Sequence, residues 1–299
     1  MLTNTRLLVA AILIPLCATP AWCQKTATAT HRNVAYHSLD PAQTLDVYLV
    51  RTEQPTPVMV FFHGGGWRAG SKQSVPAWLL RGVKNEQFSV VSVEYRFTDV
   101  ASHPAQTDDC MRAIQFVRQH ADQWNLDESR IGVTGGSAGG HLCAWVALHD
   151  DIADPKSSDP IQKVSSRVAL AVPFAGPTDW TLLNEIPHLH PAYRQLIGSE
   201  PETAFEKLDT DKLKDVSPIS FASDDDPPMM IIHGDADQIV PVQHAQRLHQ
   251  KLLANKVDSE LVIVPGASHA VAGAGDAATT KKAERFVREH FGVRNLGKQ

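Results

Sequence analysis

Five glycines surround one serine in the stretch from Ile131 to Trp145, IGVTGGSAGGHLCAW. Glycine weakens helices and strands, so this density indicates a special demand on the backbone. The residues before Ser137 (130–136) predict a strand and those after it (138–149) predict a helix. A Gly-x-Ser-x-Gly pattern at such a junction is typical of a nucleophile elbow, in which larger side chains two residues from the serine would collide.

A glycine loop between a strand and a helix also occurs in dinucleotide-binding proteins. The segment TGGSAGGH begins like such a loop, but His141 stands where the last glycine is required. No acidic residue closes a following strand about 20 residues later, as ribose binding would need. The pattern therefore favours a nucleophile, and we expect no cofactor.

Strand-like and helix-like segments alternate along the rest of the chain. The apolar runs predict strands at residues 44–50, 57–66, 88–97, 130–136, 168–176, 228–234 and 259–266. Amphipathic segments predict helices at 75–86, 103–124, 138–149, 240–255 and 277–291. Strands separated by helices imply an α/β fold with a mostly parallel sheet that carries helices on both faces.

The N-terminal residues have the pattern of an export signal. Arg6 precedes an apolar run from Leu7 to Ala18, and residues 21–23 resemble a cleavage end. We expect residues 1–23 to be a signal peptide and the protein to be secreted or periplasmic, without stable membrane insertion; an uncleaved anchor helix is the alternative. Residues 24–299 then form one catalytic domain, with a proline-rich and acidic insertion of short helices at about 176–228 lying over the site.

Composition narrows the classes of partner. The net charge of −5 argues against nucleic acid. Cys110 and Cys143 lie beyond the signal segment, where a disulfide is one alternative and two small buried thiols the other; we favour the thiols. His188 and His190 in a loop fit two exposed residues better than metal ligands, and we expect no metal.

Three further motifs agree with a serine nucleophile. The segment from His63 to Trp67, HGGGW, follows a buried strand, and consecutive glycines allow backbone amides to surround an oxyanion. Asp235 and Asp237 lie on the loop after the strand at 228–234, and His269 follows the last predicted strand. The chain order Ser, Asp, His, each after a strand, is that of α/β-hydrolases.

Taken together, these motifs resemble the α/β-hydrolase superfamily. The sequence is similar to the secreted serine esterases that act on feruloyl and acetyl (xylan) esters, and more distantly to the hormone-sensitive-lipase family. The resemblance rests on LDVYL, HGGGWRAGSK, VVSVEYR, HPAQTDD, RIGVTGGSAGGHL, GPTDW, PMMIIHGDADQIVP and PGASH, in this order over most of residues 45–269.

This resemblance implies an α/β-hydrolase fold and a set of site residues. The nucleophile falls on Ser137, the base on His269 and the acid on Asp237, while the oxyanion donors are the backbone amides of Gly65, Gly66 and Ala138. One departure is Gly136, where relatives often carry an acidic or polar residue.

The implied reaction is ester hydrolysis through an acyl-enzyme. We expect short or aromatic acyl groups on carbohydrate alcohols. A serine peptidase or amidase of the same fold and a long-chain lipase are the alternatives. A small-molecule or polysaccharide ester is the expected partner, and the oligomeric state stays open.

Overall fold

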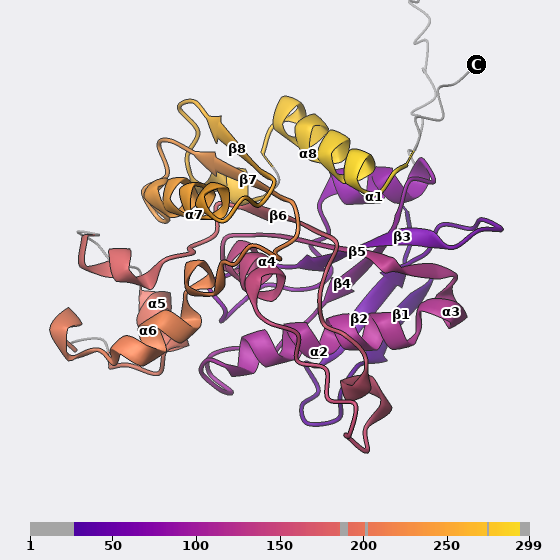
Figure 1. The fold of residues 1–299 in the computed structure, drawn as a ribbon, viewed down its shortest axis with the longest axis horizontal. Coiled ribbons are helices and arrows are strands. Elements are labelled where there is room, and N and C mark those ends of the chain that lie inside the picture. The colour runs from indigo at the N-terminus through magenta and orange to yellow at the C-terminus, as the bar shows by residue number, and fades with distance from the viewer. Residues whose placement is uncertain (1–26, 186–190, 201–202, 274, 294–299) are drawn as a thin grey trace, which may run out of the picture.

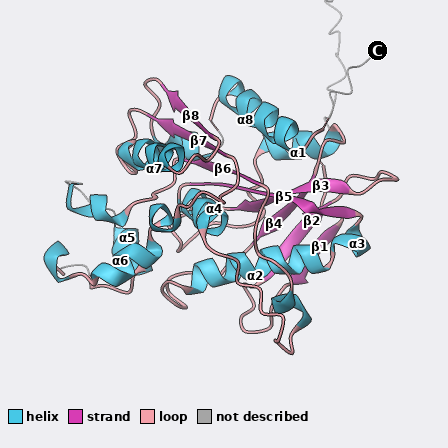
Figure 2. Ribbon diagram, in the orientation of Figure 1, coloured by secondary structure: helices cyan, strands magenta, loops and turns pink. Residues whose placement is uncertain are grey.

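An eight-stranded sheet forms the centre of the computed structural model, which describes residues 27–185, 191–200, 203–273 and 275–293. The strand order is β1-β2-β4-β3-β5-β6-β7-β8. Strands β1 and β2 run antiparallel to their neighbours, and the remaining pairs are parallel (Figures 1 and 2). The bounds are β1 His31–Ala35, β2 Thr44–Tyr48, β3 Thr56–Phe62, β4 Ser89–Val93, β5 Leu126–Gly136, β6 Leu170–Phe174, β7 Met229–Gly234 and β8 Ser259–Val264.

Helices cover both faces of this sheet. Their bounds are α1 Ala77–Lys84, α2 Ala105–Gln119, α3 Ala121–Trp124, α4 Ala138–Leu148, α5 Pro191–Leu196, α6 Thr210–Val216, α7 Gln243–Ala254 and α8 Ala277–His290, with 3₁₀ turns η1 Pro160–Lys163, η2 Trp180–Glu185, η3 Phe205–Lys207, η4 Pro218–Phe221 and η5 His269–Gly273. Helices α1 and α8 share one apolar cluster, whereas α2, α3, α4 and α7 share the other. Figure 1 shows α1 and α8 side by side, away from α2 and α4.

The alternation of strand β3 explains why two cores form. Val58, Val60 and Phe62 pack in the cluster with α2 and α4, while Met59 and Phe61 pack in the cluster with α1. Successive side chains of a strand point to opposite faces, so an unbroken apolar run is what a strand covered on both sides requires.

The topology brings the predicted motifs to one edge of the sheet. Strands β3 and β5 are parallel neighbours, with Phe62 paired to Gly135, so the loops that follow them lie next to each other. Strands β7 and β8 end at the same edge because they are also parallel to β5 and β6. Ligand sites of α/β sheets form at these carboxyl ends.

Most of the predicted elements are confirmed, and two details differ. Strand β1 was not predicted. The helix expected over 103–124 is divided at His120 into α2 and α3. The favoured prediction of two buried free thiols at Cys110 and Cys143 is confirmed, and burial raises the pKa of both thiols.

The proposed signal peptide and the pair His188 and His190 lie outside the described residues. The described part of 176–228 contains the short helices α5 and α6 and the turns η2, η3 and η4. Among the helices that the structure describes, none is long and apolar enough to cross a membrane. The domain boundaries at residues 23 and 24 stay predictions.

Candidate active site

Ser137 occupies a strained turn between β5 and α4. Its φ of 57° and ψ of −120° are unusual for a residue with a side chain. A Cβ at Gly135 would lie 2.4 Å from the carbonyl oxygen of Gly139, and one at Gly139 would lie 2.0 Å from the carbonyl oxygen of Phe62. Both contacts are too short for any side chain, so these two glycines allow the sharp turn that exposes the hydroxyl of Ser137.

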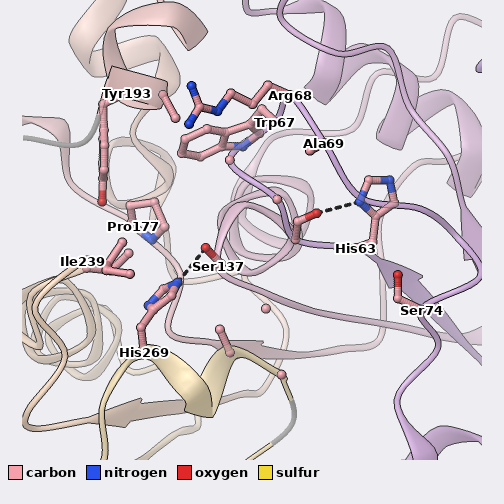
Figure 3. A pocket seen from close by; sticks show the side chains of 18 of the residues that line it. His63, Trp67, Arg68, Ala69, Ser74, Ser137, Pro177, Tyr193, Ile239 and His269 are labelled. Atoms are coloured by element: carbon pink, nitrogen blue, oxygen red, sulfur yellow. Dashed lines mark hydrogen bonds between the residues drawn. The ribbon is translucent and has the colours of Figure 1, made fainter.

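His269 lies between Ser137 and Asp237. Its Nε2 is 2.9 Å from Oγ of Ser137, and its Nδ1 is 2.7 Å from Oδ2 of Asp237. Figure 3 shows the bond between His269 and Ser137, which both line one cavity. The structure thus brings together the three residues that the sequence predicts for nucleophile, base and acid. With Nδ1 donating to the carboxylate, the unprotonated Nε2 faces the serine hydroxyl.

The carboxylate of Asp237 is held by more than its bond to His269. Its Oδ1 accepts hydrogen bonds from the backbone amides of Ile239 and Val240, each at 2.9 Å. Nε2 of His233, a fully buried residue of β7, lies 3.4 Å from Oδ2. Burial by itself would raise the pKa of Asp237, but the bonds from His233, His269 and Val240 outweigh it and hold the pKa well below its usual range.

Asp235, the other carboxylate of this loop, has a different position. Its Oδ1 accepts a 2.6 Å bond from the backbone amide of Gly266, so it ties the loop after β7 to the loop after β8. No bond joins it to His269 among the described contacts. Of the two, Asp237 is the one bonded to His269 among the described contacts. Its role as the acid, implied by the resemblance, stays a prediction.

The loop after β3 carries the predicted oxyanion donors. Gly65 has φ +117° and Gly66 has φ +62°, conformations that suit glycine. A Cβ at Gly65 would lie 2.0 Å from the carbonyl oxygen of Ala69. Both residues line the cavity above Ser137, and Ala138 begins helix α4 beside them.

His63 holds the start of this loop and does not face the serine. Its Nδ1 lies 2.8 Å from the carbonyl oxygen of Gly64, and its Nε2 lies 2.7 Å from Oε1 of Glu94. Its ring stacks on Tyr95, whose hydroxyl donates to the backbone oxygen of His63 at 2.9 Å. These contacts fix the position at which the glycines leave the strand.

His141 makes contacts at the site that the sequence did not predict. The indole Nε1 of Trp67 donates to Nδ1 of His141 at 3.1 Å, and Nε2 of His141 donates to the carbonyl oxygen of Val216 at 2.8 Å. Burial lowers the pKa of His141 to about 3, so it stays neutral and can accept the indole bond. The sequence offered one signal, the position of this residue one turn after the elbow, but nothing in it indicated Trp67 as the partner.

Gly136, the departure from the expected pattern, has a structural reason. A Cβ there would lie 1.7 Å from the carbonyl oxygen of Ala272. Ala272 belongs to η5, the turn that begins with His269. The absence of a side chain at Gly136 therefore allows η5 to pack directly against the turn at Ser137.

A cavity of about 630 Å³ opens above Ser137 and His269. The glycine loop forms one wall, and Pro177, Tyr193 and Ile239 lie on another (Figure 3). Val240 also lines the cavity. Three aromatic residues of the 176–228 segment have different positions. Tyr193 lines the cavity, whereas Trp180 packs against Trp67 and His141, and Phe221 packs against Trp145 and His149.

Comparison with family models matches residues 45–252 to BD-FAE and residues 214–291 to the dienelactone hydrolase family. A Mycobacterium tuberculosis protein named "Probable carboxylic ester hydrolase LipM" is 29% identical over 276 residues, which cover 89% of this chain and 63% of that protein. The chain thus spans less than two thirds of the length of this relative.

Two solved structures are similar over most of their length. A truncated carbohydrate esterase from gut microbiota superposes with a TM-score of 0.78 at 29% identity, covering 90% of this chain and 98% of that one. An acetyl ester-xyloside bifunctional hydrolase from Caldicellulosiruptor lactoaceticus superposes with a TM-score of 0.74 at 28% identity, covering 84% and 89%. Both likenesses agree with the α/β-hydrolase fold.

Proposed function

This chain belongs to the BD-FAE family, and from that membership and the geometry of its site we propose that it is a serine hydrolase that cleaves carboxylic esters. The observation that carries the proposal is the position of His269, within hydrogen-bond distance of both Ser137 and Asp237. A serine hydroxyl is a weak nucleophile, and a neighbouring imidazole whose other nitrogen is fixed by a carboxylate activates it.

In the proposed reaction, Nε2 of His269 takes the proton of Ser137 while Oγ attacks the ester carbonyl carbon. The carbonyl oxygen becomes an oxyanion, to which the backbone amides of Gly65, Gly66 and Ala138 donate. The protonated imidazole, stabilised by Asp237, then gives its proton to the leaving alcohol. Water attacks the acyl-enzyme with the same histidine as base and releases the acid.

We further propose short or aromatic acyl esters of carbohydrates as the substrates. The names of two structural neighbours, a carbohydrate esterase and an acetyl ester-xyloside hydrolase, support this class. The described helices of the 176–228 segment, α5 and α6, have six and seven residues. Helices this short offer little apolar surface for shielding a long acyl chain.

Export remains part of the proposal. Its support is the pattern of residues 1–23 in the sequence, and its test is the N-terminal sequence of the protein recovered from cell fractions. A mature N-terminus near residue 24 in a secreted or periplasmic fraction is expected. Full-length protein retained in a membrane fraction would favour an uncleaved anchor.

A covalent probe tests the chemistry itself. A fluorophosphonate should label the protein stoichiometrically, with the mass increase on the peptide that contains Ser137. Ser137→Ala should abolish labelling and turnover while the protein stays folded, and His269→Ala should remove nearly all turnover. Because the two residues act as a unit, the double variant should be no slower than the slower single variant. Additive losses would contradict the shared role.

An ester and an amide with the same acyl group distinguish an esterase from a peptidase or amidase. We expect hydrolysis of 4-nitrophenyl acetate and little hydrolysis of 4-nitroacetanilide, the corresponding amide. Faster cleavage of the anilide would move the chain to the amidase class.

A further inference from the structure

Tyr193 presents a hydroxyl that has no hydrogen-bond partner among the described residues, although the side chain is only 3% exposed. The residue belongs to α5 and lines the same cavity as Ser137 and His269. In Figure 3 its hydroxyl end points toward the part of the cavity beside Pro177 and Ile239.

The ring of Tyr193 is fixed from several sides. It packs against Trp67 and Trp180, with ring centroids 5.9 Å and 5.4 Å away. Its neighbour Ala192 lies against Gly66, since a Cβ at Gly66 would come within 3.2 Å of the Ala192 methyl group. The carbonyl oxygen of Leu196 accepts a 2.7 Å bond from the amide of His103, which anchors the end of α5.

These contacts keep the hydroxyl from turning outward to water. Most buried tyrosine hydroxyls find a partner, because leaving one unpaired costs free energy. Burial raises the pKa of Tyr193, and the nearby charge of Asp237 raises it further. The hydroxyl is therefore neutral and able to donate near neutral pH.

We propose that the hydroxyl of Tyr193 donates a hydrogen bond to a hydroxyl oxygen of the ester substrate, so that the cavity selects hydroxylated esters over their unsubstituted analogues. The inference rests on the proposed esterase function and specifies its substrate class. The shared chemistry is one substrate hydroxyl that lies in the same cavity as the reacting ester. It belongs either to the alcohol, as in a sugar with a free hydroxyl beside the acylated one, or to the acyl group, as in a hydroxycinnamoyl ester.

Two matched pairs of substrates separate these sources. Cyclohexyl acetate and the monoacetate of trans-1,2-cyclohexanediol differ by one hydroxyl on the alcohol. Methyl cinnamate and methyl 4-hydroxycinnamate differ by one hydroxyl on the acyl group. We expect the unmodified protein to hydrolyse the hydroxylated member of one pair about three- to tenfold faster in kcat/KM, the effect of one neutral hydrogen bond.

The variant Tyr193→Phe removes only the hydroxyl. It should reduce that preference to about one by slowing the hydroxylated ester and leaving its analogue within about twofold. Tyr48→Phe is the matched control, because Tyr48 is a buried residue of β2 that does not line the cavity. It should retain both the preference and the rates, and thermal melting should show that both variants fold.

Three results would overturn the inference. One is that the unmodified protein shows no preference in either pair, and another is that Tyr193→Phe leaves the preference intact. The third is that Tyr193→Phe slows both esters of a pair equally, which would indicate that the tyrosine only packs the site. If the unmodified protein cleaves 4-nitrophenyl acetate but none of these four esters, only this inference fails. If it also fails to cleave 4-nitrophenyl acetate, the proposed function itself fails, and this inference fails with it.

Discussion

Trp67 and His141 join the two halves of the site through one buried hydrogen bond of 3.1 Å, from the indole Nε1 to the imidazole Nδ1. Trp67 ends the HGGGW motif after β3, and His141 lies one turn into the helix that begins after Ser137. The bond therefore sets the position of the glycine amides relative to the nucleophile.

We predict that Trp67→Phe slows ester hydrolysis because it removes this bond and loosens the glycine loop. The buried Nδ1 of His141 is then unpaired, which costs about 1–3 kcal/mol of stability. We expect kcat to fall by about tenfold. This is less than the fall of roughly 100- to 1,000-fold that loss of one oxyanion donor causes. Steady-state kinetics and urea denaturation measure the two effects, and an unchanged kcat would show that the bond does not position the loop.

The two aspartates of the β7–β8 region give another prediction. Asp237→Asn should reduce kcat by several orders of magnitude, because the amide cannot stabilise the imidazolium and favours the wrong tautomer of His269. Asp235→Asn should keep most of the activity, since its carboxylate contacts only the amide of Gly266 among the described contacts. Measurement of kcat for both variants tests this prediction. A large fall in kcat for Asp235→Asn, with Asp237→Asn active, would identify Asp235 as the acid instead.

Gly136 gives a third prediction, because its missing side chain makes room for the turn that carries His269. Gly136→Ala places a methyl group 1.7 Å from the carbonyl oxygen of Ala272, so η5 must move. A shift of about 1 Å at a reacting group can cost about 100-fold in rate. We expect kcat to fall by this order, with slower fluorophosphonate labelling of Ser137. Full activity would show that the turn can retreat without carrying His269 away.

The sequence predicted most of this architecture for identifiable reasons. Strands β3, β4 and β7 are buried on both faces, so their apolar runs stand out, and the elbow glycines report a steric demand that is local. Strand β1 was missed because HRNVA is an exposed edge strand with little apolar signal. It is recognised only through its pairing with β2.

The site divides in the same way. The positions of Ser137, Asp237 and His269 follow from strand ends, which sequence patterns mark. The contact from Trp67 to His141 joins residues 74 positions apart, and nothing in the spacing of a single sequence encodes it. His233 and Asp237 are only four positions apart, but their contact depends on how the loop after β7 folds back, and the sequence pattern there indicates no more than the end of a strand.

A fourth prediction concerns stability in acid. Burial lowers the pKa of His141 and of His244 to about 3, against about 6.5 in the unfolded chain. Between these values the unfolded state binds more protons, so stability is complete above about pH 6.5 and falls as the pH drops. Each histidine should lower the free energy of unfolding by about 2 kcal/mol when the pH falls from 7 to 5. Burial raises the pKa of Asp226 to about 6. Below that pH its protonation therefore has the opposite effect and increases the free energy of unfolding as the pH falls.

Urea denaturation of His244→Asn at both pH values isolates one of these contributions. An asparagine oxygen can replace Nδ1 of His244, which accepts the amides of Thr178 and Asp179 at 3.2 Å each. The variant should lose less stability than the unmodified protein between pH 7 and pH 5. An equal loss in both would show that His244 does not titrate in this range.

The last prediction concerns the length of the acyl group. Each methylene that a pocket can bury adds about 0.8 kcal/mol, so the rate rises with chain length until the pocket is full. The cavity over Ser137 is shared by the acyl group and the alcohol, and rigid groups bound it: the glycine loop, Pro177 and the fixed ring of Tyr193. We therefore expect kcat/KM for acetyl, butyryl, octanoyl and palmitoyl esters of one alcohol to be highest at acetyl or butyryl and to fall for the longer chains. Measurements below the micelle concentration of each ester, with Ser137→Ala as the blank, avoid interfacial effects. A maximum at octanoyl or beyond would contradict the short-acyl proposal and place the protein with the lipases.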